Sequence, residues 1–492
     1  MSATSDSYAC DPAFPIGPVK TKMYGPYQIG DRVLYEKPWI FVVSEKCRQG
    51  ICNHCFQRGP TLKRCTGCGF SWYCGKECQK ASWKFVHKYE CPIFKNALAS
   101  TELAVPLTIE TVRLCLQAII RIKHDKSWNL PSDAFPILPN RTFTNLMHHW
   151  EEIQNDPAEM EFLEVMSSYF YKTFKGIADY GDLIDMDQLG VIHGRIRINN
   201  MTIFGTYGDK LGVGLYLSGS SLDHACLPNA CPSFSGTLLN IHTTESVDCF
   251  DNLRLSYLDK LYFSKPRREM LQKRYYFDCL CRACVDESLD KRMNSVRCSN
   301  CDGVILMEPF SFESEPCQKC AQSCSEKDVE NVRQMLELGR HTQILLSEAK
   351  KSDDHRRVLS LSEELNSKLR KVLHPFNSLV ISTSLQIACS ADILGQYAKA
   401  FAHFSELSTT YTKVHPFWTF QNAEILMKCT TRGLIVKTAP KEQLELLKHF
   451  VEAMKIVSVC AGRDSPTFAY YKKFYEDCRE VCSFSSPLEN NF

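Results

Sequence analysis

Residues 52 to 91 read CNHCFQRGPTLKRCTGCGFSWYCGKECQKASWKFVHKYEC, a stretch dense in cysteine. The cysteines occur in closely spaced pairs, as Cys52-x2-Cys55, Cys65-x2-Cys68 and Cys74-x3-Cys78, and His87-x3-Cys91 follows them. Thiolates and imidazoles are the ligands that zinc prefers, and this spacing lets one turn of backbone direct two donors at a single tetrahedral ion. The stretch therefore predicts two zinc sites in one small fold.

Disulfide bonds are the alternative use of these cysteines, and the chain as a whole argues against them. It has 26 Cys among 492 residues, well below the density of small disulfide-stapled scaffolds. Its first residues, MSATSDSYACDPAFP, contain no apolar core of signal-peptide length, and no apolar stretch approaches the length of a membrane span. We therefore expect a reduced, intracellular setting and about two to four domains.

The charge of the chain is nearly balanced. Its 58 basic and 56 acidic residues give a net charge of +2, which is not the electrostatic footprint of a dedicated nucleic-acid binder. The cysteine-rich stretch is locally basic, with Lys63, Arg64, Lys76, Lys80, Lys84 and Lys88, but such runs usually form a solvated face. Protein recognition is therefore favoured over direct DNA binding, and no membrane partner is expected.

Aromatic side chains lie between the cysteines, namely Phe70, Trp72, Tyr73, Trp83 and Tyr89. A fold this small is expected to bury them around the metal in place of a larger core. The spacing after Cys74 is helical, and His54 falls outside the ligand pattern, so we expect it at the surface.

This pattern closely resembles the MYND zinc finger, a protein-interaction module, with all of its ligand positions filled. The resemblance implies interleaved ligation, in which Cys52, Cys55, Cys74 and Cys78 hold one ion and Cys65, Cys68, His87 and Cys91 hold the other. It also implies that proline-rich or other peptides are the partners of the finger.

A second group of motifs lies far downstream. It comprises Leu222-Asp223-His224-Ala-Cys226-Leu-Pro228-Asn229, then Leu255-Ser-Tyr257-Leu-Asp259, then Phe277-Asp-Cys279-Leu-Cys281-Arg-Ala-Cys284. The last three cysteines are one ligand short of a tetrahedral site, which Cys226 could complete. These elements resemble the signature of SET-domain lysine methyltransferases, and a MYND finger inserted ahead of a SET core is the arrangement of the SMYD family.

The SMYD resemblance implies an S-adenosylmethionine-dependent enzyme that transfers a methyl group to lysine of histone or other proteins. It implies Tyr257 as the catalytic residue, and Tyr276 and Phe277 as candidates to line the lysine channel. The implied cofactor contacts are Asn199, Asp223, His224, Tyr257 and Phe277. It further implies three zinc ions, a monomer, and a location in nucleus and cytoplasm.

The chain departs from the family pattern at two places. Asp223 stands where the family has asparagine, and an ionised carboxylate can only accept hydrogen bonds. A Gly-x-Gly turn that normally approaches the cofactor is replaced by residues 14–30, where the glycines are Gly17, Gly25 and Gly30. The alternative hypothesis is therefore a catalytically weak or inactive SET-MYND protein that acts as an adaptor or transcriptional co-regulator.

The remaining stretches carry secondary-structure patterns. Residues 111–120 and 159–166 have helical apolar spacing, and residues 191–203 and 211–216 look like strands. The pairs Cys298-x2-Cys301 and Cys317-x2-Cys320 indicate a possible further zinc site of ribbon type. From residue 327 onward the periodicity is helical, and it resembles a degenerate array of tetratricopeptide-like (TPR-like) helices.

Together these patterns predict an α+β protein with a β-rich SET core, an inserted MYND finger, a helical insert, a post-SET zinc site and a C-terminal all-helical TPR-like domain. The expected divisions are 1–50 for the first part of the SET domain, 52–91 for the finger, 92–190 for the helical insert, 191–262 for the SET core, 263–290 for the post-SET region, 291–325 for a zinc-ribbon-like insert and 327–492 for the helical domain.

Overall fold

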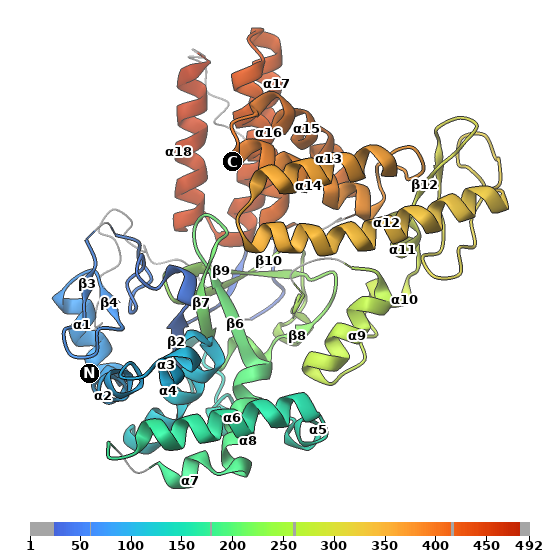
Figure 1. Ribbon diagram of the computed structural model, residues 1–492. Coiled ribbons are helices and arrows are strands. Elements are labelled where there is room, and N and C mark those ends of the chain that lie inside the picture. Colours follow the sequence, from blue (N-terminus) through green and yellow to red (C-terminus); the bar gives the residue numbers. More distant parts are fainter. Residues whose placement is uncertain (1–23, 60, 178–179, 259–261, 415–417, 483–492) are drawn as a thin grey trace.

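The structure is a computed structural model, and it describes residues 24–59, 61–177, 180–258, 262–414 and 418–482 (Figure 1). Most of the stretch that replaces the expected Gly-x-Gly turn therefore lies outside the described residues. Within its described part, a Cβ on Gly25 would come 1.9 Å from the carbonyl oxygen of Asp248, so this glycine allows a close backbone approach to the 248 loop.

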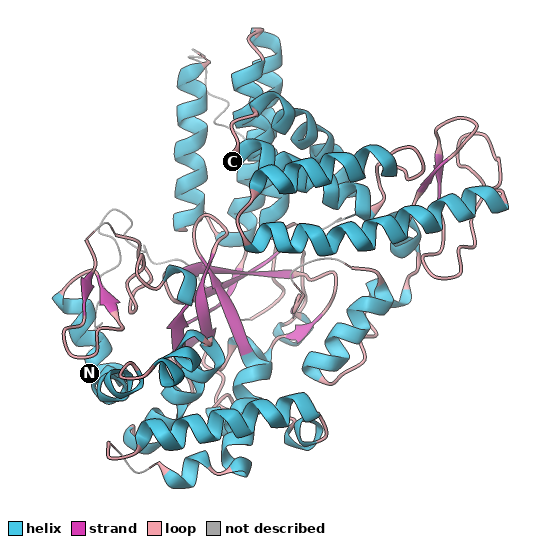
Figure 2. Cartoon of the chain, viewed as in Figure 1, coloured by secondary structure: helices cyan, strands magenta, loops and turns pink. Residues whose placement is uncertain are grey.

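Two antiparallel sheets form the centre of the molecule (Figure 2). The first has the order β5-β1-β10-β9, with β5 at Ala134–Phe135, β1 at Arg32–Glu36, β10 at Leu238–Thr243 and β9 at Ala230–Ser235. The second has the order β2-β7-β6, with β2 at Ile40–Val43, β7 at Lys210–Leu215 and β6 at Asn200–Phe204. Branched side chains such as Val33, Ile203 and Ile241 fill a shared core, which confirms a β-rich centre.

A short parallel pair brings the two downstream motifs together. Strand β8, Asp223–His224, pairs with β11, Arg254–Leu255, and His224 lies opposite Leu255. Because Tyr257 follows β11 by two residues, this pairing places the tyrosine beside the histidine.

The cysteine-rich stretch forms a hairpin followed by a helical segment, on the left in Figure 1. The hairpin pairs β3, Lys63–Arg64, with β4, Trp72–Tyr73. The helical segment consists of α1, Lys76–Ser82, a π-helical turn over Trp83–His87, and α2, Lys88–Ala97. The predicted helix after Cys74 is confirmed, and the wide turn ends at the ligand His87, as π-turns often do at functional sites.

Helices α3 to α8 lie below the sheets in Figure 1, and α4 packs on β2 and β7. They are α3 at Thr101–Ala104, α4 at Glu110–His124, α5 at Trp150–Gln154, α6 at Pro157–Phe174, α7 at Gly181–Ile184 and α8 at Met186–Asn199. Asp156 starts α6, since its side chain accepts from the amides of Ala158 and Glu159. The helices predicted over 111–120 and 159–166 are confirmed by α4 and α6.

The strand predicted over 191–203 is wrong for most of its length, because α8 continues to Asn199 and β6 begins only at Asn200. The buried residues Leu189, Ile192, His193 and Ile196 are three or four positions apart, which is the spacing of a helix face. Packing of that face outweighs the strand propensity of the β-branched residues. One helix thus crosses the expected division between insert and SET core at residue 190.

Among the described residues, no single helix is both long enough and apolar enough to span a membrane. The segments Thr101–Thr108 and Glu110–His124, bent by 92° relative to each other, meet the length and composition criteria only as a pair.

The post-SET region contains α9, Ser264–Tyr275, α10, Arg282–Val285, and α11, Ser288–Met293, before the hairpin of β12, Val296–Arg297, and β13, Val304–Ile305. The C-terminal helices are α12 at Glu326–Lys351, α13 at His355–Leu369, α14 at Ser378–Ile393, α15 at Tyr397–Val414, α16 at Phe420–Val436, α17 at Pro440–Ala461 and α18 at Pro466–Val481. Each of these packs on the next, which confirms the predicted helical array, and α17 also packs on β9 and β10.

Candidate active site and zinc centres

The cysteines and the histidine of the finger converge into two groups of four. Cys52, Cys55, Cys74 and Cys78 form the first group, and Cys65, Cys68, His87 and Cys91 form the second, with all ligand atoms of a group within 4.8 Å of one another. A tetrahedral ion with Zn–S bonds of about 2.3 Å requires separations of roughly 3.8 Å between ligand atoms. The Sγ atoms of Cys55 and Cys74 are 3.8 Å apart, and those of Cys65 and Cys91 are 3.9 Å apart. The interleaved arrangement is confirmed, and both groups fit zinc.

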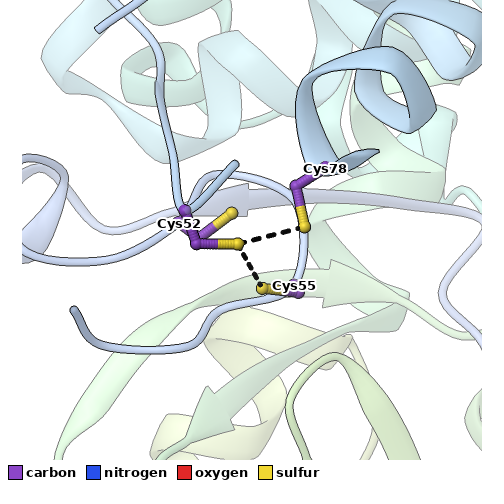
Figure 3. Close-up of side chains that lie close together, drawn as sticks. Cys52, Cys55 and Cys78 are labelled. Carbon is purple, nitrogen blue, oxygen red and sulfur yellow. Dashed lines mark hydrogen bonds between the residues drawn. The ribbon is translucent and has the colours of Figure 1, made fainter. Parts of the chain in front are cut away.

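The two groups differ in burial. In the first group Cys74 is exposed and Cys55 and Cys78 are half-buried, whereas all four ligands of the second group are buried. Figure 3 shows the sulfur atoms of Cys52, Cys55 and Cys78 facing one another, although Cys78 lies on α1 and the other two lie in the loop before the hairpin. We call the first group, which is partly exposed, the outer zinc site, and the second group, which is buried, the inner zinc site.

Two expectations about the surroundings of the finger are wrong. His54 is buried, not at the surface, because the finger packs against the SET core and the His54 ring lies 6.3 Å from that of Phe41 on β2. Trp83 is 47% exposed, whereas Phe70 and Tyr73 are buried as expected. The contact with β2 thus supplies burial that an isolated finger would have to obtain from its own aromatic residues.

The post-SET cysteines form a third group with Cys226, as predicted. Cys226, Cys279, Cys281 and Cys284 have their sulfur atoms within 4.8 Å of one another, and the Sγ atoms of Cys226 and Cys284 are 3.5 Å apart. The buried guanidinium of Arg267 donates to the Cys284 sulfur over 3.7 Å, which favours a thiolate. A zinc ion here would tie the loop after β8 to the chain after α9.

The hairpin of β12 and β13 carries the fourth group, Cys298, Cys301, Cys317 and Cys320, again with sulfur atoms within 4.8 Å of one another. The Sγ atoms are 3.7 Å apart for Cys298 and Cys320 and 3.6 Å apart for Cys301 and Cys317. These separations fit a tetrahedral zinc ion, so the geometry supports the further site that the two Cys-x2-Cys pairs predicted.

Tyr257 and His224 are held by the backbone of the two motifs. The Tyr257 hydroxyl donates to the carbonyl of Leu222 at 2.7 Å, and the Tyr257 amide donates to Nδ1 of His224 at 2.9 Å. Nδ1 is thus an acceptor, which assigns the proton to Nε2, 3.2 Å from the Cys226 sulfur. Burial lowers the pKa of His224 to about 4, so the ring is neutral and links the tyrosine to the post-SET cysteines.

Aromatic rings surround Tyr257. Its ring centroid lies 5.1 Å from that of His224, 4.9 Å from that of Tyr275 and 6.5 Å from that of Phe277. The sequence favoured Tyr276 in this group and missed Tyr275. Tyr276 has a left-handed φ of 61° at the end of α9 and lies against His149 instead, with ring centroids 5.2 Å apart.

Burial, and next to it the negative charge of Asp223, raises the pKa of Tyr257. The phenol therefore stays protonated at neutral pH, and its proton is committed to the Leu222 carbonyl. What Oη can offer a bound substrate is a lone pair, not a phenolate charge. The exposed carboxylate of Asp223 beside buried and half-buried aromatic rings also suits cationic groups such as a sulfonium or an ammonium, so the residues present fit S-adenosylmethionine.

Asn199 is the last residue of α8 and is buried. Its side-chain amide donates to the carbonyls of Met147 and Arg195 at 3.0 and 2.8 Å, which joins α8 to the loop before α5. The cofactor roles of Asn199, Asp223, His224, Tyr257 and Phe277 remain predictions.

Two supporting residues were missed by sequence reasoning. Glu36 on β1 is fully buried and accepts from the amides of Ser218 and Gly219 at 2.9 and 2.7 Å. Arg141 donates from Nε to the Leu217 carbonyl at 2.9 Å and from Nη2 to the Ser220 hydroxyl at 2.8 Å. Both hold the turn that leads to Leu222. A charged residue within an apolar strand was the available signal for Glu36, whereas Arg141 gave none.

Comparisons with known proteins agree with this geometry. The family model of the MYND finger matches residues 52–91. Human N-lysine methyltransferase SMYD2 is 23% identical over 454 residues, which cover 92% of this chain and 94% of that protein. Zebrafish N-lysine methyltransferase SMYD2-B is 24% identical over 439 residues, covering 89% and 91%. SET domain-containing protein 14 of Caenorhabditis elegans is 27% identical over 310 residues, covering 62% and 66%.

The finger match, the likeness that runs through nearly the whole chain, and the meeting of the two SET motifs at Tyr257 lead to one conclusion: the chain is similar to SMYD proteins along nearly its whole length and contains a MYND finger.

Proposed function

We propose that this chain is a protein-lysine N-methyltransferase that uses S-adenosylmethionine and acts on histone or other proteins. The observation that carries the proposal is the hydrogen bond from the Tyr257 hydroxyl to the Leu222 carbonyl inside the aromatic cluster. The human and zebrafish relatives named N-lysine methyltransferases support it.

Each residue has a physical task in this proposal. When bound, the cofactor supplies a methyl group on a sulfonium, which an amine displaces in line, so the protein must align and desolvate the amine. Because its hydroxyl donates to the Leu222 carbonyl, Tyr257 directs a lone pair of Oη at the lysine nitrogen or at the partly positive methyl group. Tyr275 and Phe277 provide ring surfaces that accept a neutral amine and attract a methylammonium product.

A tyrosine pair tests the proposal. Tyr257→Phe removes the hydroxyl, and we expect the rate of methyl transfer to fall at least ~100-fold, as for loss of a positioned polar group in the transition state. Tyr276→Phe is the matched control, because that ring lies against His149, and transfer should stay near wild type. The assay is transfer of labelled methyl to core histones and to a lysine peptide array, with cofactor binding measured by calorimetry.

Two results would reject the hypothesis that this chain is a methyltransferase. The first is no heat of binding even at roughly millimolar S-adenosylmethionine. The second is transfer by Tyr257→Phe at the wild-type rate. If the zinc content stays intact in either case, the adaptor hypothesis takes its place.

We also propose that the finger binds peptide partners, with proline-rich segments as the leading class. The specific observation is Trp83, which is 47% exposed on the π-helical turn of the finger. Trp83→Ala should weaken binding of a proline-rich peptide at least ~10-fold if this tryptophan is a binding hot spot. Tyr171→Ala, at an exposed aromatic of α6, is the control, and equal affinities of the two variants in fluorescence anisotropy would refute the proposal.

A further inference from the structure

The inner zinc site includes His87, the imidazole ligand of the finger. The ring of His87 directs Nε2 at the other ligands of this site. Nε2 of His87 lies 3.4 Å from the sulfur of Cys65 and 3.8 Å from that of Cys68. The side chain is only 1% exposed. The other ring nitrogen, Nδ1, therefore points away from the metal and into the protein.

Glu90, one helical turn along, faces this nitrogen. Its Oε2 lies 3.5 Å from Nδ1 of His87, and its side chain is 6% exposed. Its Oε1 accepts from the side-chain amide of Gln117 on α4 at 3.0 Å. The carboxylate is thus shared between the finger and the helical insert.

Gln117 connects this carboxylate to the SET core. Its Oε1 accepts from the backbone amide of Phe41 at 3.1 Å. Phe41 belongs to β2, which is an edge strand of its sheet. Hydrogen bonds therefore connect Glu90 through Gln117 to the backbone of a SET strand. Nδ1 of His87, which makes no hydrogen bond within the described part of the chain, lies at the end of this path, 3.5 Å from the Glu90 carboxylate.

The surroundings of this path are buried and carry a charged side chain. It borders a cavity of about 30 Å³ lined by Phe41, Tyr73 and Arg113, among others, with room for one or two water molecules. Arg113 is 2% exposed, and its Nε and one terminal nitrogen find no hydrogen-bond partner within the described chain.

We propose that Glu90 and Gln117 are positioning residues for the inner zinc ion, so that retention of this ion depends on the SET core. A carboxylate that accepts from the free nitrogen of a histidine ligand fixes the ring and raises the basicity of the ligating nitrogen. Gln117 orients that carboxylate, and β2 orients Gln117. The inner zinc site is thus completed by residues outside the finger, and the outer site has no such tie to Gln117.

Zinc release from the intact, zinc-loaded protein tests this directly. Excess of a chromophoric chelator, 4-(2-pyridylazo)resorcinol, reports each ion as it leaves. In Gln117→Leu and Glu90→Gln we expect one ion to dissociate about 10- to 100-fold faster than in the wild type, the range for loss of such a partner. The remaining ions should leave at wild-type rates. Gln79→Leu and Glu77→Gln, at exposed positions of α1, are the matched controls.

A double exchange separates positioning from general stability. In Glu90→Gln with Gln117→Glu, an amide again donates to a carboxylate between the two side chains, so release should be slower than in either single variant. Unchanged release in Gln117→Leu would overturn the proposal. Equal acceleration of every ion in both single variants, without recovery in the double exchange, would overturn it as well, because the effect would then be loss of fold.

Discussion

The finger and the site around Tyr257 both bring distant side chains together, but they are built in different ways. In the finger, all ligands of both zinc sites come from residues 52–91, and metal coordination sets their positions. At the tyrosine site, the residues come from β8, from the chain after β11 and from the end of α9, and backbone hydrogen bonds hold them.

This difference determines how far a local change is felt. Removing a ligand in the finger removes a metal ion, which carries most of the stability of a small zinc fold. At the tyrosine site, the turn before Leu222 depends on Glu36 and Arg141, which precede it by many residues. Changes far from Tyr257 in the sequence should therefore alter its geometry while the metals remain bound.

The largest expected effect tests the finger side of this comparison. Cys65→Ser removes a buried ligand of the inner zinc site. We expect the zinc content to fall by one ion per chain and the unfolding free energy to fall by several kcal/mol, since structural zinc supplies roughly 10–16 kcal/mol in finger peptides. Elemental analysis and denaturant unfolding give the two quantities.

Cys47→Ser is the control for that change. Cys47 is half-buried and belongs to none of the four cysteine groups, and its thiol lies 3.3 Å from the Leu211 carbonyl, a contact that a serine hydroxyl can also make. Its zinc content should equal that of the wild type. An unaltered zinc content in Cys65→Ser would contradict the assignment of this cysteine as a ligand.

A smaller effect tests the other side. The two carboxylate oxygens of Glu36 accept from the amides of Ser218 and Gly219. Glu36→Gln replaces one of these oxygens by an NH2 group, which can only donate. An unsatisfied buried amide costs about 1–3 kcal/mol, and the turn before Leu222 should relax. We expect kcat to fall about 10-fold, equivalent to ~1.4 kcal/mol in the transition state, with all zinc retained.

Glu102→Gln is a suitable control, because that carboxylate is exposed and pairs with Lys172 at the surface. Its kcat and stability should match the wild type. If Glu36→Gln lost zinc instead of catalytic rate, the separation between the two regions would fail.

The finger and the tyrosine site also differ in how well their residues could be predicted from the sequence. The zinc ligands were predictable because pairs two or three residues apart encode local geometry, and Cys226 because its partners lacked one ligand. Tyr257 and His224 were predictable only as members of a family motif. The parallel pairing of β8 with β11, which makes them neighbours, has no local signal.

Residues whose surroundings depend on packing could not be predicted. Tyr275, and not the predicted Tyr276, lies beside Tyr257. The left-handed backbone of Tyr276 at the end of α9 accompanies this arrangement. His54 is buried because a SET strand covers the finger. The second half of α8, from residue 191 to residue 199, was predicted as strand because β-branched residues favour strands locally, whereas the buried face of a helix is recognised only against its neighbours.

The smallest expected effect concerns acid, which should act on the two regions differently. In the finger, acid protonates ligands and releases zinc. In the sheet that holds Glu36, burial lowers the pKa of His242 on β10 to about 3, and Gly462 closes over its ring. Because the folded pKa lies below the unfolded value near 6.5, the unfolded chain binds this proton first, and the stability gained from neutral His242 is lost as the pH falls below 6.5. For one proton the slope is at most ~1.4 kcal/mol per pH unit.

Between pH 6.5 and 5.5, His242→Asn should flatten the pH dependence of the unfolding free energy by part of that slope while chelator-detected zinc release stays unchanged. A variant with the wild-type slope would show that His242 does not contribute, and a variant that released zinc earlier would show that the sheet and the finger respond to acid as one unit.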